Sequence, residues 1–387
     1  MLRDHWISTL ILLAGIASGF FGSSIYSALW TDSDQYNNSA DREGPAIIFS
    51  GNGKSESLVE KLTANRLLYI GEHHDRLDHH LNQLKIIKRL NETGIDFSIG
   101  LESFQRPYQQ HLGAYINGDI NEKMLLKLTG YFKNWGYDFR FYRPVITYAR
   151  ENGIQLLALN APSELVDAVS RNGLGGLEDS WENQLPIIRM TPDNQYKVRL
   201  KSFFKRHPTS EKSFERFLDV QLLWDEYMAE SLVSYLKKNP NRKIVVLAGT
   251  GHVAGGIGIP ERVYSRLPAP YQVLLNVDSE ESNAEGADYM LLTQGYELPA
   301  TGRLGLYITE DGKGVLVRKT ESIVIPNKGS IVPGDRILHI AGESIKSIED
   351  VRIALLDRQP GEQVWIELER NMIGAQPVRV AAIVELN

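Results

Sequence analysis

The sequence contains no cysteine among its 387 residues. This absence excludes disulfides, thiolate zinc sites, iron–sulfur clusters, covalent c-type haem attachment and a cysteine nucleophile. It also excludes a lipidated N-terminal cysteine as a membrane anchor. A strong charge of either sign is lacking too, because 42 Lys+Arg stand against 48 Asp+Glu, for a net charge of -6. With no basic run in addition, the composition argues against a nucleic-acid surface.

The N-terminal segment lacks charge over a long stretch. No Asp, Glu, Lys or Arg lies between Asp4 and Asp32, and residues 6–30 are largely apolar. Because about 20 helical residues cross a bilayer, this stretch predicts a hydrophobic membrane helix. Arg3 lies on one side and acidic residues follow on the other, so the positive-inside rule places the rest of the chain outside the cytoplasm. The alternative is a cleaved signal peptide, which also predicts export.

Short apolar runs alternate with helical patterns from about residue 45 to 295. Most runs are continuous rather than alternating, which is typical of strands buried on both faces. The pattern predicts an α/β fold with a mostly parallel sheet flanked by helices. The predicted strands are Ala46–Phe49, Leu67–Ile70, Phe97–Leu101, Ile154–Leu159, Ile244–Ala248, Val273–Val277 and Tyr289–Leu292, and the predicted helices include His79–Leu90, Arg143–Glu151 and Ser213–Leu236.

The sequence changes character after Gly302. Short strand-like runs and many glycines surround one helical stretch, Ser347–Leu356. This predicts a separate, β-rich domain. The expected division is therefore a signal anchor or signal peptide (1–30), a polar linker (31–44), an α/β domain (45–295) and a β-rich domain (303–385).

Polar residues follow four of the predicted strands. In parallel sheets, ligands bind just beyond the carboxyl ends of the strands, so we expect these residues to meet. The first set lies in the stretch GEHHDRLDHH at 71–80, and single residues follow the other three strands. They are Glu72, His73, His74, Asp75, Asp78, His79 and His80, then Glu102, Asn160 and His252.

This set suits several chemistries. Imidazole and carboxylate side chains together suit a divalent metal. Two carboxylates, Glu72 and Glu102, suit acid and base roles. The imidazoles also suit haem iron or a haem propionate. For His79 and His80 a merely structural role at the start of a helix is an equally open interpretation.

At these motifs the sequence resembles the ChaN haem-binding family of the Tiki and erythromycin-esterase superfamily. The resemblance covers about residues 45–295, and several long motifs occur in the family's order. They are GEHH (71–74), GLESFQRP (100–107), WGYDFRFYRP (135–144), LNAPSELV (159–166), QLLWDEYMAE (221–230) and LAGTGHVAGGIGIPERV (247–263).

The resemblance implies a haem-binding protein that acts in haem or iron uptake at the bacterial envelope. It would lie in the inner membrane facing the periplasm, or in the periplasm if the signal is cleaved. The family is associated with a homodimer and a tyrosine ligand to iron, for which Tyr108, Tyr137 and Tyr142 are the candidates. The resemblance also implies a site shared across the superfamily, here Glu72, His74, Glu102 and His252, which could hold a divalent metal. The superfamily includes metal-dependent hydrolases. On that alternative Glu72 or Glu102 is the general base, and His74 and His252 bind metal or orient water.

The C-terminal segment resembles a bacterial PDZ domain. The resemblance lies in VPGDRILHIAGESIKSIEDVRIALL (332–356) and PGEQVWIELER (360–370). It implies that an extended peptide of a protein partner adds as a strand to a sheet edge. The backbone amides of Leu304, Gly305 and Leu306 would bind its terminal carboxylate. The alternative is a packing module of this shape without a peptide ligand.

Overall fold

The computed structural model describes residues 47–49, 62–188, 190–204, 211–279, 286–320 and 330–387. The chain forms two compact units, one from Met1–Asn121 with Asn134–Glu297 and one from Glu122–Lys133 with Leu298–Asn387. The membrane segment predicted at 6–30 and the linker predicted at 31–44 lie outside the described residues. Within the described ranges, no helix is long and apolar enough to cross a membrane.

The first unit is built on a seven-stranded sheet in the order β1-β7-β6-β2-β5-β3-β4. Six strands are parallel, and β1 pairs antiparallel with β7 at one edge. The predicted strands are therefore confirmed, and so is the mostly parallel sheet. Their bounds are β1 Ile47–Phe49, β2 Leu67–Glu72, β3 Phe97–Gln105, β4 Gln155–Asn160, β5 Lys243–Gly249, β6 Tyr271–Val277 and β7 Tyr289–Leu292.

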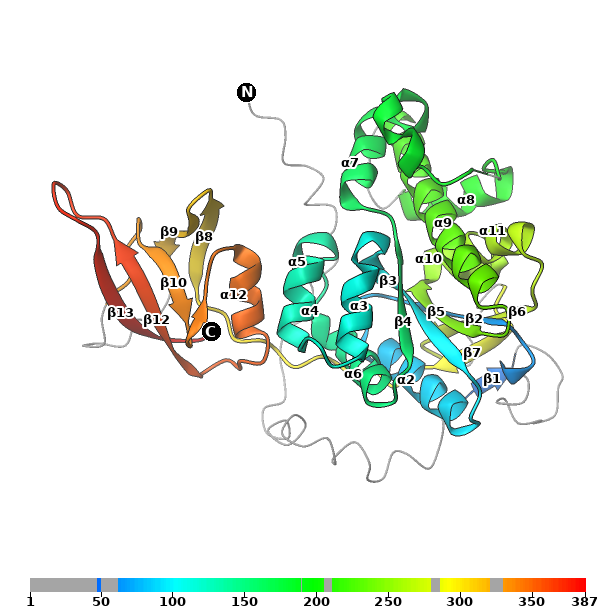
Figure 1. The fold of residues 1–387 in the computed structure, drawn as a ribbon, viewed down its shortest axis with the longest axis horizontal. Helices are drawn as coiled ribbons and strands as arrows, with labels where there is room; N and C mark the ends of the chain where they lie inside the picture. Colours follow the sequence, from blue (N-terminus) through cyan, green and yellow to red (C-terminus); the bar gives the residue numbers. More distant parts are fainter. Residues whose placement is uncertain (1–46, 50–61, 189, 205–210, 280–285, 321–329) are drawn as a thin grey trace. The chain divides into compact units, whose positions relative to one another are not determined.

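Helices flank this sheet on both sides (Figure 1). The continuous apolar runs of the strands are buried on both faces, as β2 and β3 show along their whole length. One face packs against apolar residues of α9 and α11 in a shared core. The helices of this unit are α2 Leu77–Glu92, α3 Gln109–Ile116, α6 Arg143–Glu151, α7 Ser163–Asn172, α8 Asn194–Phe204, α9 Glu211–Lys238, α10 Thr250–Val253 and α11 Ile259–Arg266, with 3-10 turns at η3 Arg106–Tyr108, η4 Phe139–Phe141, η5 Leu174–Gly176, η6 Asp179–Gln184 and η7 Ala254–Gly256. The short helix α5 (Tyr131–Asn134) crosses the division between the units.

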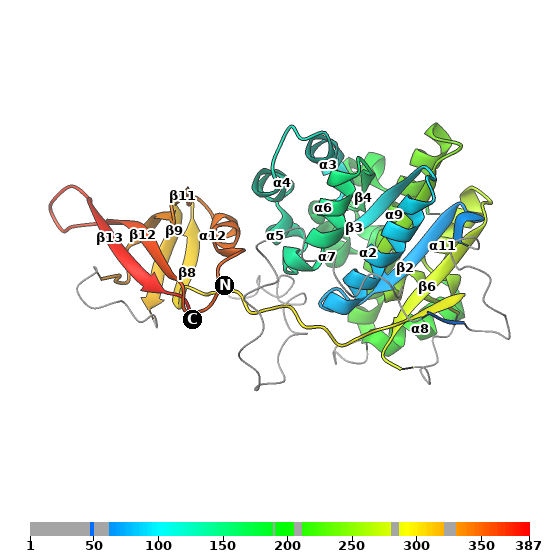
Figure 2. The ribbon, with the colours of Figure 1, turned by 90° about the horizontal axis from the view of Figure 1, so that it is seen from below.

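The second unit is an antiparallel sheet in the order β13-β12-β10-β9-β8, with β11 paired to β10 (Figure 2). It encloses its own apolar core together with α12. Strand β8 ends the order, so its outer edge has no strand partner among the described residues. The predicted β-rich region with one helix is confirmed. The elements are α4 Glu122–Thr129, β8 Leu306–Asp311, β9 Gly314–Thr320, β10 Arg336–Ile340, β11 Glu343–Ser344, α12 Ile348–Leu355, β12 Gln363–Arg370 and β13 Val378–Glu385.

Candidate functional site

Four adjacent strands of the parallel sheet, β2, β5, β3 and β4, end at the same edge. Glu72 at the end of β2 pairs in register with Gly249 at the end of β5. On β3 the pairing with β4 shifts after Leu101, so that four residues of β3 run beside two of β4. Glu102 lies in this irregularity, and such bulges re-aim side chains near functional sites. Sheet order and this bulge therefore bring the two glutamates to one place.

Glu72 is a buried carboxylate surrounded by donors. Its Oε1 atom accepts from Tyr142 at 2.9 Å and lies 2.9 Å from His74 Nδ1, while Oε2 accepts from Gln83 at 2.5 Å. Burial alone would raise the pKa of Glu72. The neighbouring imidazoles of His80 and His74 and the hydrogen bonds from His74 and Gln83 outweigh it and lower the pKa to about 2. Glu72 is therefore ionised at neutral pH.

Glu72, His74, Glu102 and His252 form what we call the strand-end cluster. Its His74 reaches the surface, with 19% of the side chain exposed. Its ring contacts Trp135 edge-on, with centroids 4.8 Å apart, and lies tilted against Tyr137 at 4.9 Å. Burial lowers the pKa of His74, but the hydrogen bond to Glu72 and the charge of Glu102 raise it overall. A Cβ on Gly249 would lie 3.0 Å from this ring. The strand end therefore passes close beneath His74 because residue 249 lacks a side chain.

His252 and Glu102 form the other half of the cluster. His252 Nε2 lies 3.4 Å from Glu102 Oε1, and the other oxygen of Glu102 accepts from the Gly249 amide at 2.7 Å. His252 Nδ1 lies 2.6 Å from Asp225 Oδ1. Burial lowers the pKa of His252, but Glu102 and Asp225 raise it to about 9. The structure thus brings together Glu72, His74, Glu102 and His252.

The raised pKa of His252 predicts a loss of stability in alkali. Its folded pKa of about 9 exceeds the ordinary 6.5, so its contribution is complete below pH 6.5 and is lost as the pH rises through 9. We expect the free energy of unfolding to fall by roughly 3 kcal/mol between these limits. Urea titrations at pH 6 and about pH 9.5 measure the fall, and His252→Asn should flatten it. An equal fall in His252→Asn would contradict the assignment.

The other two predicted histidines are buried rather than presented to a ligand. His79 Nδ1 accepts from the His73 amide at 2.9 Å, and burial lowers the pKa of His79 to about 4. His80 Nε2 lies 3.3 Å from the carbonyl oxygen of His74, and its Nδ1 lies 3.5 Å from Glu72 Oε2. Both side chains therefore contact the backbone of the turn between β2 and α2 and stabilise it.

The three candidate tyrosines have different surroundings. Tyr142 is buried, and its hydroxyl donates to Glu72 at 2.9 Å, so it is committed within the cluster. Tyr108 is half-buried, and its hydroxyl accepts from Asn134 at 3.5 Å. Tyr137 is half-buried beside His74, and burial, reinforced by nearby carboxylates, raises its pKa to about 12. Of the three, Tyr137 has the position best suited to a ligand above His74.

The divalent-metal prediction finds no support. Within the described part of the chain, no group of three or more His, Cys, Asp or Glu residues is arranged to hold a metal ion. Three of the four carboxylate oxygens of Glu72 and Glu102 already accept hydrogen bonds within the protein. Glu72 accepts from Gln83 and Tyr142, and Glu102 accepts from the Gly249 amide.

Sequence reasoning missed two buried residues that support His252. Asp225 lies on α9, and its Oδ2 atom accepts from the Tyr196 hydroxyl at 2.7 Å. Asp225 stands in the motif QLLWDEYMAE, which drew attention only as a resemblance. The sequence did contain one indication of a buried polar site here, because two adjacent acidic residues, Asp225 and Glu226, interrupt an apolar stretch of the predicted helix. Tyr196 carries no comparable signal.

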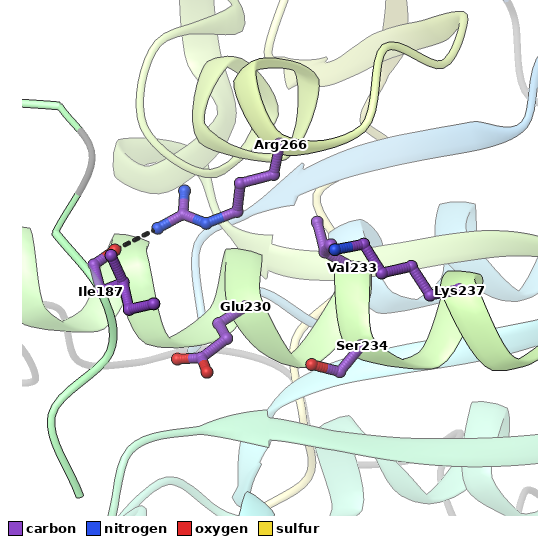
Figure 3. A pocket seen from close by; sticks show the side chains of 6 residues that line it. All are labelled: Ile187, Glu230, Val233, Ser234, Lys237 and Arg266. Carbon is purple, nitrogen blue, oxygen red and sulfur yellow. Dashed lines mark hydrogen bonds between the residues drawn. The ribbon is translucent and has the colours of Figure 1, made fainter. Parts of the chain in front are cut away.

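A pocket of about 140 Å³ lies elsewhere in the first unit, between α9 and α11 (Figure 3). There Arg266 donates to the backbone carbonyl of Ile187 at 2.6 Å. The residues that line this pocket are Ile187, Glu230, Val233, Ser234, Lys237 and Arg266. None of them belongs to the strand-end cluster, so the pocket does not contribute to that site.

The family model described as "Haem-binding uptake, Tiki superfamily, ChaN" matches residues 58–263, more than half of the chain. The chain belongs to this family. All four residues of the cluster and Asp225 lie within the matched range. The resemblance of the sequence to the ChaN family is thereby confirmed.

Two proteins similar to this ChaN-family chain are distant from it in sequence. A chloroplast protein of Arabidopsis thaliana, RETICULATA-RELATED 5, is 24% identical over 250 residues, covering 59% of this chain and 33% of the relative. The chain thus spans about a third of the length of that protein. The solved structure "Cofacial heme binding to ChaN of Campylobacter jejuni" is 22% identical and covers 64% of this chain and 96% of that one, with a TM-score of 0.52. This likeness supports the fold of the first unit.

Proposed function

We propose that this protein binds haem at the strand-end cluster, beside His74, and acts in haem or iron uptake. Membership of a haem-binding uptake family is the observation that carries the proposal. The cluster adds local support, because polar and aromatic side chains meet at the carboxyl ends of parallel strands, where such sheets bind ligands.

The residues around His74 fit a flat, iron-containing ligand. His74 exposes part of an imidazole, a common ligand of haem iron. Trp135 and Tyr137 lie against that ring and offer aromatic surface to a porphyrin. Tyr137 also offers a phenol oxygen, although its pKa of about 12 means that iron would have to displace a tightly held proton. Bound iron would supply the redox and ligand chemistry, while these side chains hold and orient the group.

A haem titration tests this proposal. We expect the full chain in detergent to give a saturable Soret band with haem. His74→Ala and Tyr137→Phe should each weaken binding about tenfold or more, if each removes one direct contact of roughly 1.4 kcal/mol. Tyr307→Phe, at an exposed tyrosine of the second unit, is the matched control and should leave the affinity unchanged. Absence of a saturable band would refute haem binding, and sedimentation with haem would report whether a homodimer forms.

A hydrolase is the second candidate, favoured by the two carboxylate–imidazole pairs of the cluster. Glu72 with His74 at 2.9 Å and Glu102 with His252 at 3.4 Å suit general base catalysis. The test is turnover of chromogenic esters and peptides with and without a chelator. Turnover that survives purification and is lost in Glu102→Gln would favour hydrolysis. No turnover above that of this variant would end the idea.

The second unit is proposed to dock a peptide of a protein partner along β8. Its support is that β8 has no strand partner on its outer edge among the described residues, because such edges accept an added strand. Leu304 is buried, Gly305 has a φ of 61°, and Leu306 begins β8. Loss of binding to a C-terminal peptide library when Gly305→Val is introduced would support this assignment. Unchanged binding would argue against it.

We also propose that residues 6–30 anchor the chain in the bacterial inner membrane with both units in the periplasm. The support is the apolar, uncharged run and the charge on either side of it. Fractionation with protease protection of spheroplasts tests the orientation. Resistance of the chain to protease added outside would contradict it.

A further inference from the structure

The imidazole of His252 lies between two buried carboxylates. Its Nδ1 atom is 2.6 Å from Asp225 Oδ1, and its Nε2 atom is 3.4 Å from Glu102 Oε1. Asp225 is 1% exposed, Glu102 5% and His252 7%. Buried carboxylates this close favour a charged imidazole with a proton on each nitrogen. A nitrogen that carries a proton has no lone pair for a metal or for iron.

Asp225 is itself held in place by contacts on the side away from His252. Its second oxygen accepts from the buried Tyr196 hydroxyl at 2.7 Å. The backbone also closes tightly around it at Gly258, whose φ is 96°. A Cβ on Gly258 would lie 2.4 Å from the His252 carbonyl oxygen and 3.2 Å from Asp225 Oδ2. The aspartate therefore has little freedom to turn away from His252.

His74 is placed differently. Its Nδ1 atom is taken by Glu72 at 2.9 Å, but within the described part of the chain its Nε2 atom has no hydrogen-bonding partner. Its side chain is also the more exposed, at 19% against 9% for His252. The two imidazoles of the cluster are therefore not equivalent toward a ligand.

We propose that Asp225 is a positioning residue that, with Tyr196 behind it, fixes His252 toward Glu102 as a doubly protonated imidazolium and so leaves His74 as the ligand-facing imidazole. This deepens the proposed haem site and rests on it for its functional meaning. It also reverses the expectation that His252 binds iron or metal. His252 serves instead as a fixed positive charge that balances the two carboxylates.

The ring-nitrogen signals of the histidines test this directly. The full chain, labelled with ¹⁵N-histidine and free of haem, is examined at pH 7.5 by two-bond ¹H–¹⁵N correlation, with His252→Asn used for assignment. We expect the imidazolium pattern for His252. Asp225→Asn, nearly equal in size, should convert it to a neutral tautomer. Tyr196→Phe should shift the His252 signals while keeping both protons, because the Asp225 carboxyl group stays beside Nδ1.

Asp219→Asn is the matched control, since it makes the same change six residues earlier on α9. It should leave the His252 signals unchanged. A circular-dichroism melt confirms that each variant is folded, and a merely structural role of Asp225 would move the melt without altering the protonation pattern. A neutral His252 in the unaltered chain, or an imidazolium that persists in Asp225→Asn, would overturn the proposal. Because haem is absent, these outcomes are independent of whether haem binds.

Discussion

Glu72→Ala is expected to lower the free energy of unfolding by about 3–5 kcal/mol, the range for removing one partner from a buried charged network. The residue is 2% exposed, and its carboxylate accepts from Gln83 and Tyr142. Alanine would remove the buried acceptor that both donors share and the carboxylate that orients the His74 ring. An unsatisfied buried polar group costs about 1–3 kcal/mol each. Urea denaturation at pH 7 measures the loss, and Asp75→Ala, at an exposed carboxylate three residues away, is the control.

The same carboxylate predicts the acid limb of the stability profile. The folded pKa of Glu72 is about 2, below the ordinary 4.5. Its contribution is therefore present above pH 4.5 and is lost as the pH falls through 2, by roughly 3 kcal/mol. Glu72→Gln keeps the shape but does not titrate, so its profile should be flatter over this interval. Equal slopes in the two proteins, or a loss in Asp75→Ala as large as in Glu72→Ala, would show that Glu72 is not the group responsible.

Most of the α/β framework could be predicted from the sequence because buried parallel strands have a local signature. Runs such as Leu67–Ile70 and Ile244–Ala248 are continuous and apolar, and both are strands within a residue or two of the predicted ends. The strand order could not be predicted in this way. It depends on which strand packs beside which, and β5 lies between β2 and β3 although more than 130 residues of chain separate it from each.

The polar residues of the site were predictable where they follow a strand directly. Glu72 and Glu102 lie within two residues of the ends of the predicted strands Leu67–Ile70 and Phe97–Leu101, and the parallel arrangement then places them at one edge. Asp225 does not follow a strand. It lies within α9, and its contact with His252 spans 27 residues of sequence. Such contacts depend on helix rotation and packing, which the local pattern leaves undetermined.

The roles of the histidines were also beyond the sequence, because residue type does not fix protonation. His79 and His80 occupy the same motif as His74, yet both are buried in the folded chain. His252 and His74 both lie beside glutamates, yet one has a carboxylate on each side and the other has an exposed edge. The environment of each ring therefore decides whether it supports the site or meets a ligand.

Glu226 is expected to be as critical for stability as Glu72, although it contacts no residue of the cluster. Its side chain is 0% exposed and forms ion pairs with Arg266 and with Arg262, the latter at 3.4 Å. It also accepts from the Met190 amide at 3.2 Å. Alanine at this position would leave two arginines in the interior without this carboxylate, which costs about 3–5 kcal/mol.

Glu230→Ala is the matched control, because Glu230 lies one turn further along α9 and is only half-buried. We expect that control to change the free energy of unfolding by less than about 1 kcal/mol, as is usual away from buried charged networks. The loss in free energy of unfolding for Glu226→Gln should lie between those of Glu226→Ala and Glu230→Ala, since glutamine can still accept hydrogen bonds but carries no charge. If urea titrations show similar losses in the free energy of unfolding for Glu226→Ala and Glu230→Ala, the ion pairs of Glu226 with Arg262 and Arg266 do not stabilise the fold.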